Sequence, residues 1–188
     1  MMILPSSTVD FKAWFSCGVI GTPPLITIGI DQTTIHESQM PLDYLEFSIP
    51  LGSCSHQLWI RYGHKKLDNE SWVDGVKQDT WIEIQNLSIN GSMMNHLLND
   101  CAYTEVDWHQ HPDVADWFLN NRGKVPDRLN KVKYQNLTSC YRFDFDLPLD
   151  QFLDRHLKID PNWAHMYNAP MSRYQDLKLK LERLYKQN

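Results

Sequence analysis

An acidic segment between two predicted strands is the first candidate site. Its four carboxylates are Asp68, Glu70, Asp74 and Asp79. Calcium takes several oxygen ligands from flexible loops, so this segment could form a calcium site. A solvated acidic hairpin loop explains the same pattern, and both interpretations stay open. We predict no required cofactor.

Two tryptophans, Trp72 and Trp81, lie within and just after this acidic segment. An exposed aromatic ring with polar neighbours is typical of sugar-binding sites, because a pyranose ring presents an apolar face. Packing in a hydrophobic core explains a single tryptophan equally well. We take Trp72, Asp74 and Trp81 as the candidate ligand-binding residues.

A second polar cluster lies at residues 107–113, where His109 and His111 are two positions apart between carboxylates. On an extended strand both imidazoles would point the same way and could share a metal ion. A polar surface loop fits equally well. No third ligand can be identified from the sequence, and we therefore assign no metal site.

Catalytic motifs are missing from the sequence. Residues 52–56 place serines and Cys54 beside His56, but a nucleophile elbow of the G-x-S-x-G type does not occur. Neither a G-x-G-x-x-G loop nor a P-loop is present. We interpret residues 52–56 as a polar turn before a strand and predict that the protein is not an enzyme.

Charge and composition exclude several classes of protein. The 188-residue chain has 18 basic and 23 acidic residues, a net charge of −5, with 42% apolar residues. This composition excludes intrinsic disorder and makes nucleic acid an unexpected partner. The N-terminus lacks a signal-peptide pattern and no stretch is long and apolar enough to span a membrane. The scattered cysteines are expected to be reduced: Cys17, Cys54, Cys101 and Cys140.

Alternating apolar residues predict β-strands over most of the first two thirds of the chain. The alternating sets are Val9 to Phe15, Ile26 to Ile30, Leu45 to Ile49, Leu58 to Tyr62 and Tyr141 to Phe145. In the stretch from Thr80 to Ile89 the pattern slips by one residue, which predicts a β-bulge before the turn at Asn90-Gly91. We predict a mainly β fold, an antiparallel β-sandwich of jelly-roll type with C-terminal helices.

The domain division follows from where this alternation fails. We predict a sandwich domain over residues 1–157, with a long irregular excursion at 100–137 that holds a short helix over Val114 to Leu119. A helix is predicted to begin near Pro148. Residues 158–188 are predicted to form a linker and an amphipathic docking helix.

That last helix is predicted over Ser172 to Tyr185. Its apolar stripe consists of Tyr174, Leu177, Leu181 and Leu184. A stripe of about three turns is too short to be stable alone in water. We therefore predict that these four residues form an interface, either with the sandwich or with a neighbouring subunit.

Two blocks of sequence carry a resemblance to a known class of proteins. The blocks are His56–Tyr62, Lys65, Asp68, Val73–Gly75, Asp79–Ile84 and Leu87–Gly91, and then Tyr141–Leu149 with Phe152–Leu153. They resemble β-sandwich proteins of tailed bacteriophages, including cyanobacterial phages, which in turn resemble jelly-roll, calcium-dependent xylan-binding modules.

This resemblance implies a non-enzymatic virion structural protein of the tail, baseplate or fibre apparatus. Its partners would be other virion proteins in a homo-oligomer or symmetric assembly, and it would be assembled in the host cytoplasm. Neither nucleic acid nor a membrane is an expected partner. The alternative function is a carbohydrate-binding module that recognises a host glycan, with or without a dependence on calcium.

Overall fold

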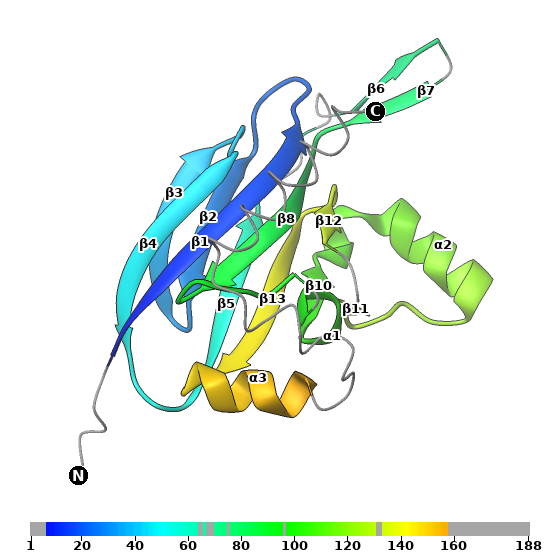
Figure 1. Cartoon of the computed structure of the whole chain (residues 1–188). Helices are drawn as coiled ribbons and strands as arrows, with labels where there is room; N and C mark the ends of the chain where they lie inside the picture. The colour runs from blue at the N-terminus through cyan, green and yellow to red at the C-terminus, as the bar shows by residue number, and fades with distance from the viewer. Residues whose placement is uncertain are drawn as a thin grey trace, which may run out of the picture.

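Two antiparallel β-sheets packed face to face form the body of the protein (Figure 1). The computed structural model describes residues 7–63, 66, 70–74, 76–95, 97–130 and 133–157. Along the chain, successive strands cross repeatedly between the two sheets, as in a jelly roll. The predicted antiparallel β-sandwich is confirmed.

The first sheet has five strands in the order β12-β8-β1-β4, with β9 paired to β8. Its strands are β1 (Ser7–Gly18), β4 (Tyr44–Leu51), β8 (Trp81–Ile89), β9 (Ser92–Met93) and β12 (Tyr134–Gln135). The predicted bulge is confirmed in β8. Trp14 of β1 lies opposite Asn86 and Phe15 lies opposite Ile84, so Gln85 is the extra residue.

The second sheet has six strands in the order β11-β10-β13-β5-β2-β3. Its strands are β2 (Leu25–Ile30), β3 (Thr33–Gln39), β5 (Ser55–Tyr62), β10 (Ala102–Val106), β11 (Leu129–Asn130) and β13 (Ser139–Asp146). The alternation did not predict β3, because this edge strand is rich in polar residues and no member of it is fully buried.

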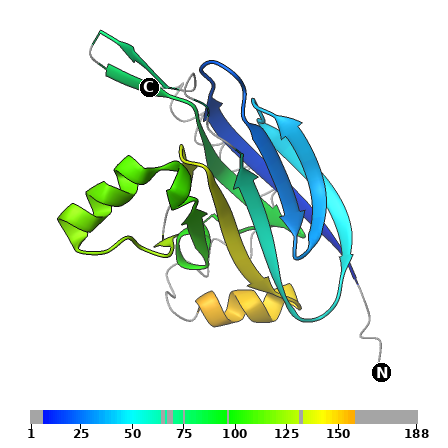
Figure 2. The same cartoon turned by 180° about the vertical axis from the view of Figure 1, so that it is seen from behind.

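A two-stranded ribbon and several short helices complete the described fold. The ribbon, β6 (Glu70–Val73) and β7 (Val76–Asp79), projects from one end of the sandwich (Figures 1 and 2). The helices are α1 (Leu97–Asp100), the 3-10 turn η2 (Trp108–Gln110), α2 (Pro112–Arg122) and α3 (Leu149–Leu157). None of the helices described here is long and apolar enough to cross a membrane.

The hydrophobic core lies between the two sheets. Side chains alternate along each strand, so that Phe11 of the first sheet and Phe145 of the second both point inward and meet edge to face at 5.7 Å. Phe11 also stacks on Phe47 at 4.9 Å. Burying each such ring contributes about 1.5–3 kcal/mol relative to exposure. Phe152 of α3 packs against Phe143, which places α3 against the second sheet.

The predicted irregular excursion at 100–137 is partly wrong. It contains β10, which pairs with β13 inside the second sheet. Thr104 is a buried polar residue on the inward side of β10, and this hides the apolar alternation. The helix in this region is also longer than predicted, because Pro112 starts α2 and Gly123, in the left-handed region at φ 75°, ends it.

Other local predictions are confirmed. Asn90 and Gly91 have φ values of 48° and 78° and form a tight hairpin turn. A helix follows Pro148, and Leu153 packs against the core. The predicted linker and docking helix of residues 158–188 lie outside the described residues, as do the interface residues Tyr174, Leu177, Leu181 and Leu184.

Candidate functional site

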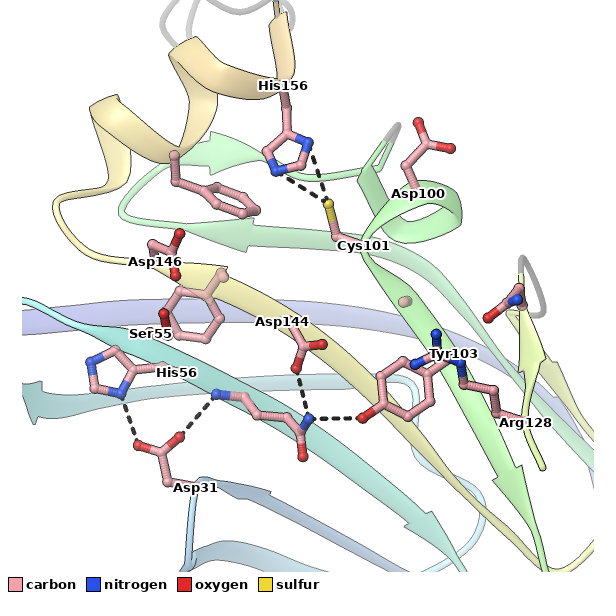
Figure 3. Close-up of a pocket in the computed structure, with 15 residues that line it drawn as sticks. Asp31, Ser55, His56, Asp100, Cys101, Tyr103, Arg128, Asp144, Asp146 and His156 are labelled. Carbon is pink, nitrogen blue, oxygen red and sulfur yellow. Dashed lines mark hydrogen bonds and ion pairs between the residues drawn. The ribbon is translucent and has the colours of Figure 1, made fainter. Parts of the chain in front are cut away.

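An open pocket of about 670 Å³ lies against the second sheet (Figure 3). Strands β5, β13 and β10 supply its floor, and α3 supplies part of its wall through Phe152 and His156. We call it the sheet-face pocket.

Strand register brings the polar side chains of the pocket together. Gln57 of β5 is the direct partner of Asp144 on β13, and Tyr103 of β10 is the direct partner of Arg142, two residues along β13 from Asp144. The inward positions next to them, Leu58 and Phe143, are buried in the core. Because side chains alternate along a strand, Gln57, Asp144 and Tyr103 project from the outer face.

Gln57 is the centre of a hydrogen-bond network that joins three strands. Its Nε2 donates to Asp144 Oδ1 at 2.7 Å and to Tyr103 Oη at 3.2 Å. Its Oε1 accepts from Arg142 Nη1 at 2.5 Å. The donor on one side and the acceptors on the other fix the orientation of the amide. The Tyr103 hydroxyl accepts in this network and so keeps its own proton to donate.

Two cations lie on the same sheet face in different settings. Arg142 is held by Glu105, whose Oε2 accepts from Nε at 2.6 Å. Burial is the largest single effect on the pKa of Arg142 and lowers it. The hydrogen bond to Glu105, together with nearby charges, outweighs burial, and the pKa is raised. The Arg128 guanidinium instead lies over the Tyr103 ring, 4.9 Å from its centroid. Such a contact is a cation–π interaction. The face of Tyr103 is therefore a place where a positive charge is stabilised.

At the other end of the pocket, Asp31 and His56 form a second polar arrangement. His56 is 7% exposed, and its Nδ1 lies 2.8 Å from Asp31 Oδ2. Its Nε2 lies 2.8 Å from the carbonyl oxygen of Gly52. The second oxygen of Asp31 accepts from the backbone N–H of Gln57 at 2.9 Å. These bonds fix the Asp31 carboxylate at the pocket edge.

The thiols near the pocket are poorly placed for nucleophilic chemistry. Cys54 Sγ is 3.4 Å from His56 Nε2, but that nitrogen has its nearer contact with the Gly52 carbonyl. Cys101 Sγ is 3.7 Å from the ring nitrogens of His156. Burial raises the pKa of Cys101 to about 11, so its thiol stays protonated at neutral pH. This geometry supports the interpretation of residues 52–56 as a polar turn.

The three predicted ligand-binding residues do not lie in this pocket. Trp72 is on the ribbon, 70% exposed and opposite Lys77. Asp74 is in the turn of the ribbon with φ 51°. Trp81 begins β8, stacks on Tyr134 at 5.3 Å and lies against Gly18. Trp72 and Trp81 are therefore apart, because Lys77, the partner of Trp72, lies four positions before Trp81, which is about 13 Å of extended chain.

The carboxylates of the predicted calcium segment are spread along the ribbon. Glu70 and Asp79 face each other at its base and Asp74 lies at its turn, while Asp68 lies outside the described residues. Asp79 Oδ2 accepts from Asn136 Nδ2 at 3.0 Å. Among the residues that the structure describes, no group of three or more His, Cys, Asp and Glu side chains could hold a metal ion.

The extended conformation in which His109 and His111 could share a metal ion does not occur. Trp108–Gln110 forms the 3-10 turn η2, and His111 precedes the first turn of α2. His111 Nε2 accepts the backbone N–H of Thr138 at 2.7 Å, whereas His109 is exposed. Pro112 favours a helix start and so breaks the extended backbone that metal sharing would need.

Sequence reasoning missed Gln57, Tyr103, Asp144 and Arg128 as site residues. The available signal was the alternation in β5 and β13, which places Gln57 and Asp144 on the outer face. Both are polar residues inside strongly apolar strands. Tyr103 had no such signal, because its strand was assigned to the irregular excursion.

Comparisons with known proteins give one similar structure. No family model and no curated protein matches the sequence. The fold is similar to a solved carbohydrate-binding module described as "vCBM60 in complex with galactobiose", with a TM-score of 0.40 and 6% sequence identity over 73% of this chain and 97% of that chain. None of these findings supports the bacteriophage resemblance.

Proposed function

We propose that the protein is a non-catalytic carbohydrate-binding protein that holds a glycan in the sheet-face pocket. The observation that carries this proposal is the network of Gln57, which holds a hydroxyl donor on Tyr103 beside a carboxylate acceptor on Asp144. Sugar hydroxyls both donate and accept hydrogen bonds. A donor and an acceptor fixed side by side therefore match the hydroxyl pairs of a pyranose.

The aromatic ring and the size of the pocket support the same ligand. Tyr103 adds an apolar ring surface next to these polar groups, which suits the apolar face of a sugar. A volume of about 670 Å³ falls in the range of small-ligand pockets. The fixed network lowers the ordering cost of binding, because the protein groups are already in place before the ligand arrives.

The test is a glycan array followed by titration calorimetry on the strongest oligosaccharide. Tyr103→Ala and Asp144→Ala should each weaken binding by about tenfold or more, since each removes a hydrogen bond and Tyr103→Ala also removes the ring. Ser48→Ala, on the outer face of the first sheet, is the matched control and should bind as the wild type does. Unchanged affinity in both pocket variants would contradict the proposal.

The calcium-dependent alternative at Trp72, Asp74 and Trp81 makes a different prediction. Binding there would be abolished by a chelator and by Trp72→Ala, because both the ion and the exposed ring would be needed. Binding in the sheet-face pocket should survive both treatments. The two locations are therefore separable with the same oligosaccharide.

The virion setting stays a prediction of the sequence resemblance. A structural protein of a phage tail, baseplate or fibre that assembles in the host cytoplasm could use the pocket to recognise a host glycan. Mass spectrometry of purified virions and measurement of the oligomeric state test this setting. A monomer that is never found in virions would contradict it without affecting glycan binding.

A further inference from the structure

The sheet-face pocket is rich in negative charge. Its lining includes four aspartates, Asp31, Asp100, Asp144 and Asp146, and one arginine, Arg128. Two of the aspartates have cationic or potentially cationic partners: Asp31 contacts His56, and Asp146 is paired with Arg155 of α3. Asp144 differs from these two, because its Oδ1 accepts from the neutral amide of Gln57.

The single arginine of the lining is placed on an aromatic ring. Arg128 lies 4.9 Å over Tyr103, and among the described residues it forms no ion pair with an aspartate of the pocket. Arg142, the next cation on this face, is neutralised by Glu105. The Arg128 side chain therefore shows that a cation is accommodated on the Tyr103 ring, and within the part of the chain that the structure describes the nearby Asp144 carboxylate forms no ion pair.

We infer that the sheet-face pocket selects a sugar that carries a protonated amine, an inference that rests on the proposed function. The amine takes the place of the Arg128 guanidinium on the Tyr103 ring and donates to the second oxygen of Asp144. Arg128 is an exposed side chain, and it can leave the ring when the ligand arrives. A neutral sugar gains only hydroxyl hydrogen bonds at this point, and an acidic sugar meets the charge of Asp144.

The size of the preference follows from the kinds of hydrogen bond involved. An ammonium group donates to the Asp144 carboxylate with a full positive charge of its own, whereas a hydroxyl donates to it as a neutral group, so the amine forms the stronger hydrogen bond. The amine also gains the cation–π contact with Tyr103. We expect an amino sugar to bind about tenfold more tightly than its neutral counterpart. The advantage should shrink as salt is added, because the pocket is open and its charges are screened.

Three oligosaccharides of equal length isolate the amine. Cellotetraose, tetra-N-acetylchitotetraose and the fully deacetylated chitosan tetramer share one β-1,4-linked backbone and differ only in the group on C2: hydroxyl, acetamide or amine. Calorimetry in mildly acidic buffer keeps the amine protonated. We expect the deacetylated tetramer to bind most tightly and the other two to bind within about twofold of each other.

Asp144→Asn tests whether the preference comes from the pocket. The asparagine oxygen still accepts from Gln57, so the network is kept while the charge is removed. The preference for the amine should disappear, so that the ratio of the affinities for the deacetylated tetramer and for cellotetraose falls from about ten to about one. Asp10→Asn is the matched control: Asp10 accepts from Ser48 on the opposite face at 2.6 Å, and its loss should leave the preference unchanged.

The outcomes separate this inference from the proposed function. Equal affinity of wild type for all three tetramers overturns the inference and leaves glycan binding intact. A loss of preference in Asp10→Asn equal to that in Asp144→Asn also overturns it, because it shows general attraction of a polycation. If no glycan binds, or if Tyr103→Ala and Asp144→Ala both bind glycans as the wild type does, the proposed function fails and the inference fails with it. A melting curve for each variant confirms that it is folded.

Discussion

The outer faces of the two sheets use polar side chains in opposite ways. On the first sheet, polar groups pair directly across neighbouring strands: Lys12 with Glu46 at 2.8 Å and Ser48 with Asp10 at 2.6 Å. On the second sheet, one residue, Gln57, joins side chains from three strands. Direct pairs satisfy each other, whereas a shared centre holds several groups in place and leaves some of their hydrogen-bonding capacity for a ligand.

The two faces also differ in how a tryptophan rests on the sheet. Trp59 on the second sheet is 9% exposed and lies against Gly29. Its Nε1 donates to the backbone oxygen of Asp31 at 2.8 Å, which anchors the turn that carries the Asp31 carboxylate. Trp81 on the first sheet lies against Gly18 and stacks on Tyr134. The glycine of the second sheet therefore supports the edge of the pocket, and that of the first sheet supports an aromatic pair.

Substitution of these two glycines should give the largest difference between the faces. A Cβ at Gly29 would clash with the Trp59 ring and with the backbone oxygen of Thr33, whereas the three atoms nearest to a Cβ at Gly18 all belong to the Trp81 side chain, the first of them 2.6 Å away. Because backbone cannot swing aside, Gly29→Ala should cost about 3 kcal/mol and Gly18→Ala about 1 kcal/mol in the free energy of unfolding. Denaturant unfolding measures both, and equal losses would contradict this view.

A buried histidine should give the second largest effect. His56→Phe removes both polar contacts of the ring, one with the Gly52 carbonyl and one with an Asp31 oxygen. We expect a loss of about 2 kcal/mol in the free energy of unfolding, with weaker glycan binding because Asp31 is released. Cys54→Ser is the control, since it keeps both contacts of His56. A melting temperature equal to wild type in His56→Phe would show that these contacts contribute little.

The centre of the network should matter for binding more than for folding. Gln57→Ala removes the shared partner of Tyr103 and Asp144, and the affinity for a glycan should fall by about tenfold. The free energy of unfolding should fall by only about 1 kcal/mol, because Gln57 is half-buried on the outer face. Calorimetry beside a melting curve separates the two effects. Equal binding by Gln57→Ala and wild type would contradict the idea that the polar network on the second sheet holds groups in place for a ligand.

Local sequence pattern predicted the strands of the sandwich well but the site poorly. Alternation identifies β5 and β13 and places Gln57 and Asp144 on their outer faces. Their meeting depends on the pairing of two strands whose contact residues are 87 positions apart. Such pairing is set by the packing of the whole sandwich, which no local pattern contains.

The tryptophans also show what a local sequence pattern does not predict. Trp59, Trp72 and Trp81 are equally apolar in sequence, yet Trp59 is nearly buried on an outer face and Trp72 is 70% exposed on the ribbon. The difference arises from Gly29, which makes room for the Trp59 ring on the sheet. A tryptophan next to acidic residues therefore predicts a ligand contact only when its neighbours across the sheet are known.

The smallest effect is expected for the exposed ion pair on the first sheet. Hydrogen bonds from Lys12 and Tyr44 lower the pKa of Glu46, and the hydrogen bond to Glu46 raises the pKa of Lys12. Because the pKa of Glu46 is lowered, its ionised carboxylate stabilises the folded state at pH values above the ordinary pKa of 4.5. This contribution is lost as the pH falls through the lowered pKa. The raised pKa of Lys12 acts in the opposite sense, with its contribution lost as the pH rises above 10.5.

Between these limits Glu46→Gln removes the pair but still offers an oxygen to Tyr44. Because both charges are exposed and screened, its melting temperature at neutral pH and its affinity for glycans should equal those of wild type. A clear loss of glycan binding in Glu46→Gln would instead place a binding surface on the first sheet.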